Sequence, residues 1–331
     1  MFANRFLPLL RRQCATLAMG LACAVLPGTG AAAVIRVLMA DENAAHTEFV
    51  RQLRETQEAG SSLELIHVAA GRPSGESVEE DHSAGMRTRG VRLAPTDTPI
   101  TMAVGVDASR TAIERPGQDP LVLAMLSRLD YESLKDNPAL RRPDRWIGVL
   151  LREPAMADQI TLIDAVMPQR RRLGVVVTAE SEPMIRELRR AANGWDLQVE
   201  YATDAKALAA ALRRLVPRSD ALMVLPDLIG DSQPATLAVL RAGASAGLPV
   251  FGTSDGLVRS GGLAAAVSTP AQLAQQARLL GLKLASNTAA GGLLVECATP
   301  STVRVNPTVA RGLGMRLPEE RELTERVTAI R

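Results

Sequence analysis

The stretch LQVEYATDAKALAAALRRLVPRSDALMVL, residues 197–225, decides the fold class. Its two apolar runs, 197–201 and 221–225, have the length of buried strands, and segment 205–215 between them repeats its leucines at helical spacing. A strand, a helix and a second strand in this order form a unit whose strands lie parallel. The stretch therefore predicts an α/β protein with a parallel sheet.

The same alternation continues on both sides of this unit. We expect, in chain order, strand 146–151, helix 155–167, strand 173–177, helix 182–192, then helix 236–246 and strand 249–251. Two capping signals mark further helix starts: Thr269 is followed by Pro270 and Gln272, and Asn306 is followed by Pro307.

The first half of the chain carries a second set of the same elements. We expect strand 35–39, helix 45–57, strand 63–68, strand 100–104, helix 108–114 and strand 121–126. Residues 71–97 are polar and rich in turn formers, and they form either an inserted loop or a region whose helix the pattern does not reveal. Two sets of alternating elements predict two doubly wound parallel-sheet lobes.

Residues 1–33 have the features of a secretory signal peptide. Arg5, Arg11 and Arg12 form a positive start, residues 14–26 are apolar, and Ala31 to Ala33 supply a small-residue cleavage site. The apolar run is too short for a retained membrane span, because Pro27 interrupts it. We predict export to the periplasm and no membrane span in the mature chain.

Charge and composition argue against several kinds of partner and cofactor. Removal of residues 1–33 changes the formal net charge from +2 to −1, so no electrostatic footprint for nucleic acid or an anionic membrane remains. Cys297 is then the single cysteine and reads as a small buried apolar residue. No histidine or cysteine pair has metal-ligand spacing, and no glycine-rich loop has the setting of a nucleotide site. We therefore predict no metal and no cofactor.

One motif would suggest an enzyme. Residues 252–256, GTSDG, match the G-x-S-x-G turn that places the nucleophile of an α/β-hydrolase after a strand. That mechanism needs a histidine downstream of the serine, whereas His46, His67 and His82 all lie upstream. A strand end followed by a helix that Ser254 caps is the favoured interpretation, so we predict a binding protein and keep a serine hydrolase as an alternative.

A series of motifs resembles the ABC transporter substrate-binding proteins of the tryptophan/tyrosine type. The resemblance covers about residues 146–320, and in the first half it is carried mainly by VGVDA (104–108) and PLVL (120–123). In order, the later motifs are WIGVLLREP (146–154), LGVVV (173–177), ALMVLPD (221–227), LPVFG (248–252), GGLA (261–264) and VNPTVARGLG (305–314).

The resemblance implies a type I periplasmic-binding fold, in which two α/β lobes joined by three crossovers enclose a ligand cleft. On this basis we expect residues 34–145 plus 256–289 to form the first lobe and 146–255 plus 290–331 the second. The crossovers would lie near 140–146, 255–262 and 289–293. The helix beginning at Pro270 would then pack on the first lobe although it follows the second in sequence. The implied partners are a small-molecule ligand and an ABC transporter permease.

Ligands of open parallel sheets bind beyond the carboxyl ends of the strands. The candidate ligand-binding residues at these ends are Asp41, Asn43, Ala44, Gly105, Asp107, Glu153, Ala179, Asp227, Thr253, Ser254 and Asp255. Each polar one could instead be an ordinary helix cap. Carboxylates at several strand ends, with Arg152 nearby, would suit an amino-acid-like ligand. A degenerate envelope interaction module without a small ligand remains a second possibility.

Overall fold

The computed structural model describes residues 34–57, 62–69, 99–287 and 291–329. The predicted signal peptide, the polar segment 71–97 and His82 lie outside the described residues.

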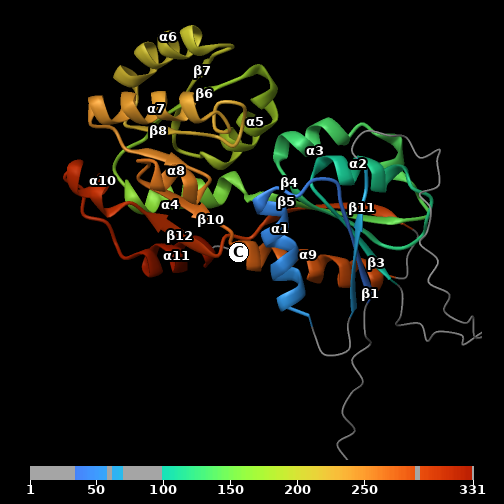
Figure 1. Cartoon of the computed structure of the whole chain (residues 1–331). Helices are drawn as coiled ribbons and strands as arrows, with labels where there is room; N and C mark the ends of the chain where they lie inside the picture. The colour runs from blue at the N-terminus through green and yellow to red at the C-terminus, as the bar shows by residue number, and fades with distance from the viewer. Residues whose placement is uncertain (1–33, 58–61, 70–98, 288–290, 330–331) are drawn as a thin grey trace, which may run out of the picture. The chain divides into compact units, whose positions relative to one another are not determined.

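Six parallel strands form the first sheet, in the spatial order β11-β5-β4-β3-β1-β2 (Figure 1). The strands are β1 (Val34–Met39), β2 (Ser62–His67), β3 (Ile100–Val104), β4 (Leu121–Leu126), β5 (Trp146–Pro154) and β11 (Gly292–Ala298). Helices cover both of its faces, so the sheet is doubly wound. One face carries α1 (Ala44–Glu55) and α9 (Pro270–Ala285), and the other carries α2 (Val106–Glu114), α3 (Arg128–Leu134) and the short turn η1 (Pro138–Arg141).

The second sheet also has six strands, in the order β12-β10-β9-β8-β6-β7, and only the β10–β12 pair is antiparallel. Its strands are β6 (Arg172–Val177), β7 (Asp196–Tyr201), β8 (Ala221–Met223), β9 (Val250–Gly252), β10 (Ala264–Val267) and β12 (Thr302–Val305). One face packs against α4 (Met156–Val166), α5 (Glu182–Ala191), α10 (Pro307–Gly312) and α11 (Glu320–Thr328). The other packs against α6 (Ala205–Leu215), α7 (Gln233–Ala246) and α8 (Asp255–Arg259). Short turns η2 (Ala179–Ser181) and η3 (Val216–Arg218) complete the set.

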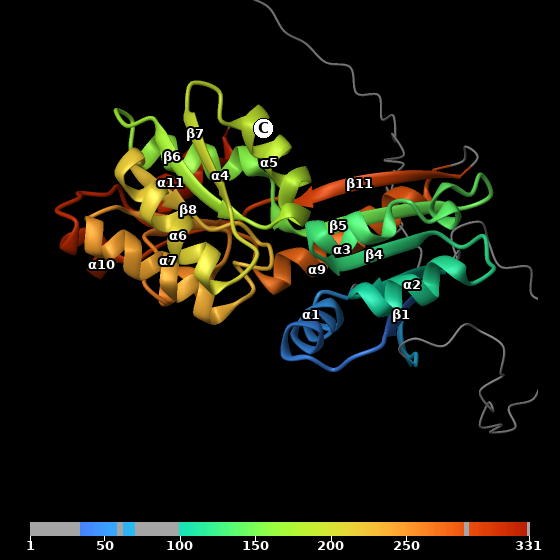
Figure 2. The ribbon, with the colours of Figure 1, turned by 90° about the horizontal axis from the view of Figure 1, so that it is seen from above.

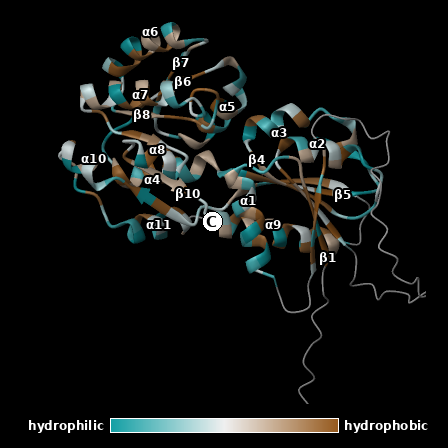
Figure 3. Ribbon diagram, viewed as in Figure 1, coloured by the Kyte–Doolittle hydropathy of each residue, from teal (hydrophilic) through white to brown (hydrophobic). Residues whose placement is uncertain are grey.

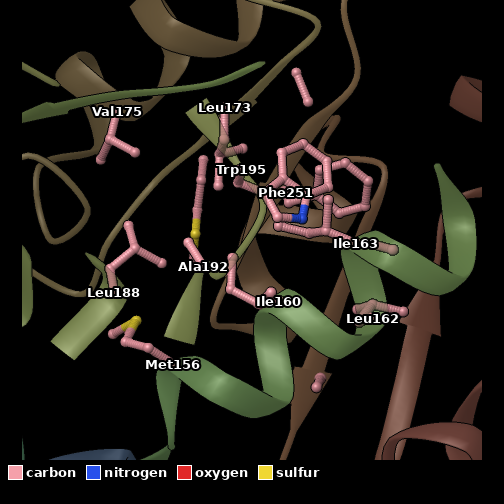
Figure 4. Close-up of a cluster of buried hydrophobic side chains, with 14 of the residues drawn as sticks. Met156, Ile160, Leu162, Ile163, Leu173, Val175, Leu188, Ala192, Trp195 and Phe251 are labelled. Carbon is pink, nitrogen blue, oxygen red and sulfur yellow. The ribbon is translucent and has the colours of Figure 1, made fainter. Parts of the chain in front are cut away.

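The core is built from aliphatic strands and the apolar faces of helices. Figure 3 shows that the strands of both sheets are largely hydrophobic while the helices mix hydrophobic and hydrophilic residues. In the second sheet, Ile160 and Ile163 of α4 turn toward Trp195 and Phe251 (Figure 4). All four side chains are buried, and burial of each aliphatic one stabilises the fold by about 1.5–3 kcal/mol.

The expected α/β fold with two doubly wound, mostly parallel sheets is confirmed, but the expected crossover positions are wrong. Strand β5 is part of the first sheet rather than the start of the second, β10 is part of the second, and β11 is part of the first. The chain therefore passes between the sheets at 154–156, 267–270 and 298–302. The reason is that a strand buried on both faces carries no local sign of the neighbour with which it pairs.

Helix α9 packs on the first sheet, as the resemblance implied. Leu273, Ala277 and Leu280 lie in the same buried cluster as the side chains of β1 and β3. Gly148 of β5 makes this packing possible, because a Cβ there would lie 2.9 Å from side-chain carbons of Leu280 and Leu284. The Thr269 capping box and the Asn306 cap also form as predicted.

Candidate functional site

A cavity of about 420 Å³ lies where the two sheets' strand ends and crossover segments meet. The first sheet contributes Arg152, Glu153 and Pro154 from the end of β5, and the second contributes the segment 253–255 after β9. The remaining lining residues are Met125, Val224, Leu225, Pro226, Gly230, Asp231, Leu257, Val267, Ser268, Thr269, Pro270, Leu273 and Arg304. Its volume lies within the usual range for small-molecule sites.

The segment after β9 is shaped by a helix cap. The Ser254 hydroxyl accepts a hydrogen bond from the Leu257 backbone N–H at 3.2 Å and so begins α8. Asp255 follows as the first helical residue, with one oxygen 2.9 Å from Arg259 and the other 3.8 Å from Arg304. Its side chain stays 40% exposed, so the carboxylate can still accept a bond from a ligand.

The opposite wall carries an ion pair at the end of β5. The Arg152 Nε donates to Glu153 at 2.7 Å, and the second Glu153 oxygen accepts the Arg128 backbone N–H at 3.2 Å. Arg152 also lies 3.9 Å from Asp231, which follows β8 in sequence. Burial raises the pKa of Glu153 and of Asp231, and the charge of Arg152 opposes this rise in both. The wall therefore presents a cation held between two carboxyl groups.

Four of the predicted site residues line this cavity, namely Glu153, Thr253, Ser254 and Asp255. Asp231, Arg304 and the cap residue Thr269 also line it but were not predicted as site residues. Arg304 could have been noticed as the one charged residue of the otherwise uncharged strand 302–305, whereas Asp231 carries no comparable signal.

Asp41, Asn43 and Gly105 lie against His46 at a different place, and Ala44 is the exposed first residue of α1, two positions before this histidine. The Asp41 carboxylate lies 2.5 Å from His46 Nδ1, and the Asn43 side chain caps α1 by accepting the His46 backbone N–H at 2.9 Å. Burial opposes ionisation of Asp41, yet the hydrogen bonds from His46 and Asn43 lower its pKa below the usual value. Gly105 has a φ of +83° and lies against the His46 ring. These residues form a corner beyond β1 and β3 in which Asp41, Asn43 and Ala44 are exposed, and the corner is not part of the cavity lining.

Asp107, Ala179 and Asp227 lie outside the cavity lining as well. Asp107 sits in the first turn of α2 and contacts Arg110 at 3.4 Å. Asp227 is fully buried, and its oxygens accept bonds from the Ser181 hydroxyl at 2.6 Å and from the backbone N–H groups of Ile229 and Gly230 at 3.0 Å. These hydrogen bonds hold the loop after β8 in place. Ala179 is an exposed residue of η2.

The geometry offers the hydrolase alternative no support. Ser254 serves as a helix cap, and the two histidines of the described ranges, His46 and His67, lie beside Asp41 and Glu42 at the first sheet. Within residues 34–57, 62–69, 99–287 and 291–329, no group of three or more His, Cys, Asp or Glu side chains is arranged to hold a metal ion. Cys297 is a free, partly buried thiol whose Sγ lies 3.3 Å from an Arg128 nitrogen, and burial raises its pKa.

Comparison with known families gives one match that spans most of the chain. Residues 100–325 match the family model described as ABC transporter substrate binding protein. A comparison with curated protein sequences finds no match. In the part of the chain that the structure describes, no helix has the length and apolar character that crossing a membrane requires.

Solved structures with a similar fold include three bacterial proteins. A domain from Streptococcus pneumoniae in complex with L-Trp is 16% identical, with 87% of this chain and 96% of that one covered and a TM-score of 0.52. A conserved domain protein from Vibrio cholerae is 19% identical, with 89% and 98% covered and a TM-score of 0.55. A ligand-free, open substrate-binding protein with adhesive properties from Clostridium difficile is 15% identical, with 87% and 97% covered and a TM-score of 0.62. At these identities the likeness concerns the type I periplasmic-binding fold.

Proposed function

Because the chain belongs to the ABC transporter substrate-binding protein family, we propose that its cavity captures a small zwitterionic ligand, an aliphatic amino acid, for delivery to a transporter. Membership implies a small-molecule ligand and an ABC transporter as the partner. The identity of the ligand and its binding residues are our proposal.

The observation that supports a zwitterion is the presence of both signs of charge around one cavity. Arg152 and Arg304 are paired with a ligand carboxylate in this proposal, and Asp255 and Asp231 with its amino group. Charge-assisted hydrogen bonds of this kind are shorter and stronger than neutral ones, and the planar arginine group suits a carboxylate. With Glu153 the lining holds two arginines and three carboxyl groups, so a ligand that carries both signs of charge finds partners for each.

The uncharged part of the lining indicates an aliphatic side chain. Met125, Val224, Leu257 and Leu273 supply apolar surface, and no aromatic side chain lines the cavity within the described residues. An aromatic ligand would find no ring to stack against. We therefore expect leucine-like amino acids to bind better than tryptophan.

The test is a stability screen of the purified protein against amino acids, peptides and small anions. A ligand at a hundredfold excess over its Kd raises the free energy of unfolding by about 2.7 kcal/mol, which is visible as a higher melting temperature. Each responding amino acid is compared with its amide and with its deaminated acid, which lack one of the two charges. Equal responses to all three would contradict zwitterion recognition. A protein that responds to no metabolite would fit the envelope interaction module instead.

We further propose that residues 1–33 direct export to the periplasm and are then removed. Their positive start, apolar run and small residues before Val34 support this. Mass spectrometry of the protein secreted by an expressing bacterium should give a chain that begins at Val34. A secreted chain that retains Met1 would contradict it.

A further inference from the structure

A second, larger cavity of about 770 Å³ lies between α6 and α7 on one face of the second sheet. The two helices lie side by side in Figures 1 and 2. We call this cavity the α6–α7 groove. Its apolar lining consists of Ala202, Ala205, Leu208, Ala209, Leu212, Val216, Pro217, Leu228, Ile229, Pro234, Ala235, Ala238, Ala242 and Ala246.

Small side chains on α7 keep this groove open. Where α7 faces α6, its lining residues include alanine at positions 235, 238, 242 and 246, which cannot fill the space between two helices. Leu228 at one end is 56% exposed, one of three exposed large hydrophobic side chains in the described part of the chain. Exposed apolar surface gathered in a concave site is a sign of ligand binding.

Two arginines border the groove. Arg213 and Arg241 each lie nine residues after the cap residue of their helix, Asp204 and Ser232. Both helices run antiparallel to the neighbouring parallel strands, so the two residues lie at a similar height along the groove, and both line it. Asp204, the one carboxylate of the lining, lies about 13 Å away along α6 and is engaged with the Ala207 backbone N–H.

Arg213 and Arg241 differ in their ion pairing from the nearby arginines outside the groove. Arg214 and Arg218 both pair with Glu200, at 2.7 and 2.6 Å. Arg213 and Arg241 have no carboxylate partner among the described residues. The groove therefore combines an apolar floor with two arginines that no carboxylate of the described residues neutralises.

We propose that the α6–α7 groove binds a single-chain amphiphilic anion, with its carboxylate or sulfate group between Arg213 and Arg241 and its apolar chain along the groove toward Leu228. The lining of α7 from Pro234 to Ala246 extends about 18 Å, enough for an extended alkyl chain. An amphipathic helix of that length, about 10 Å across, would occupy roughly 1,400 Å³ and remain largely outside the groove. The volume thus favours the smaller ligand.

The test is calorimetric titration of the whole mature protein with dodecanoate below its micelle concentration. One variant carries Arg213→Gln and Arg241→Gln. Its matched control carries Arg214→Gln and Arg218→Gln, which removes the same charge from the same lobe outside the groove. A third variant, Ala242→Phe, fills the groove without changing charge. Circular dichroism verifies that all three are folded.

We expect one dodecanoate per chain, about tenfold weaker binding in the Arg213 and Arg241 variant, and affinity within about twofold of wild type in the control. Ala242→Phe should abolish binding, and dodecyltrimethylammonium and acetate should bind at least about tenfold more weakly than dodecanoate. Absence of dodecanoate binding to the wild type would overturn the proposal. So would equal losses in the two double variants, or equal affinity for the cationic amphiphile.

Discussion

Replacing Asp255 by asparagine should weaken capture of an amino-acid ligand about tenfold while leaving the fold almost as stable as before. The Asp255 carboxylate lies 2.9 Å from Arg259 and 3.8 Å from Arg304, and it is 40% exposed. A charge-assisted hydrogen bond contributes about 1.5–3 kcal/mol. Because two arginines already share this charge and water reaches it, we expect the lower end, about 1.4 kcal/mol or tenfold in Kd.

The loss of ligand affinity can be separated from any loss of folding stability, because Asp255 is not the cap residue of α8. Ser254 caps α8, and asparagine at 255 removes only exposed ion pairs, one with Arg259 four residues along the helix and a longer one with Arg304. Such exposed pairs contribute about 0.3–0.5 kcal/mol. Calorimetric titration with the amino acid found in the screen measures the first effect, and urea unfolding measures the second.

Asp107→Asn is the matched control. Asp107 also lies in the first turn of a helix after a parallel strand, is 46% exposed and contacts an arginine, but it does not line the cavity. We expect its affinity for the ligand to be unchanged. Equal weakening by both substitutions would refute the assignment of the cavity, because the ligand would then lie between more distant strand ends. Unchanged affinity in Asp255→Asn would refute the role of this carboxylate.

Three further predictions concern stability. Gly105→Ala should cost at least about 2 kcal/mol in urea unfolding, since φ is +83° and a Cβ would lie 2.5 Å from the His46 ring; a loss below about 0.5 kcal/mol would contradict this packing. Ser254→Ala should cost about 1 kcal/mol while Ser254→Asp, which can also cap, should not; equal losses would exclude the cap. Hydrogen bonds from Arg172 lower the pKa of Asp220 to about 2, so this carboxylate stabilises the fold above about pH 4 and loses that contribution as the pH falls toward 2. Because Arg172 is half exposed, we expect about 1 kcal/mol, and Asp220→Asn should remove this part of the acid dependence of unfolding; an unchanged acid transition would contradict it.

The sequence pattern was sufficient to predict the helices and strands, but not to predict which sheet each strand joins. The strand 100–104, the strand 121–126 and the helix 205–215 have the predicted bounds, because alternation of short apolar runs with amphipathic helices is a local signal. Strand β5 was assigned to the wrong lobe because its own sequence does not indicate which strands it pairs with, and in the structure these are β4 and β11. Hydrogen-bond partners of a central strand are set by the whole fold.

The candidate site was predictable only where it follows a strand directly. Residues 253–255 and Glu153 line the cavity because they stand at the ends of β9 and β5. Arg304 enters from the antiparallel strand β12, whose place at the sheet edge no local pattern reveals. The residues around His46, which the same rule also selected, lie outside this cavity, and their side chains hydrogen-bond one another.

The position of the cavity connects ligand capture with the crossover segments. Its lining includes Arg152, Glu153 and Pro154 from the end of β5, directly before the first crossover, and residues 267–270 from the second. These segments are where the chain passes from one sheet to the other, so their backbone angles determine how the two sheets can move relative to each other. A ligand that bonds Arg152 on one wall and Asp255 on the other can make both bonds in only one relative arrangement of the two sheets. It stabilises that arrangement by the difference between its binding free energies in the two arrangements. Substitutions that alter the crossover backbone at Pro154 or Pro270 should therefore change ligand affinity even though neither side chain offers a hydrogen bond.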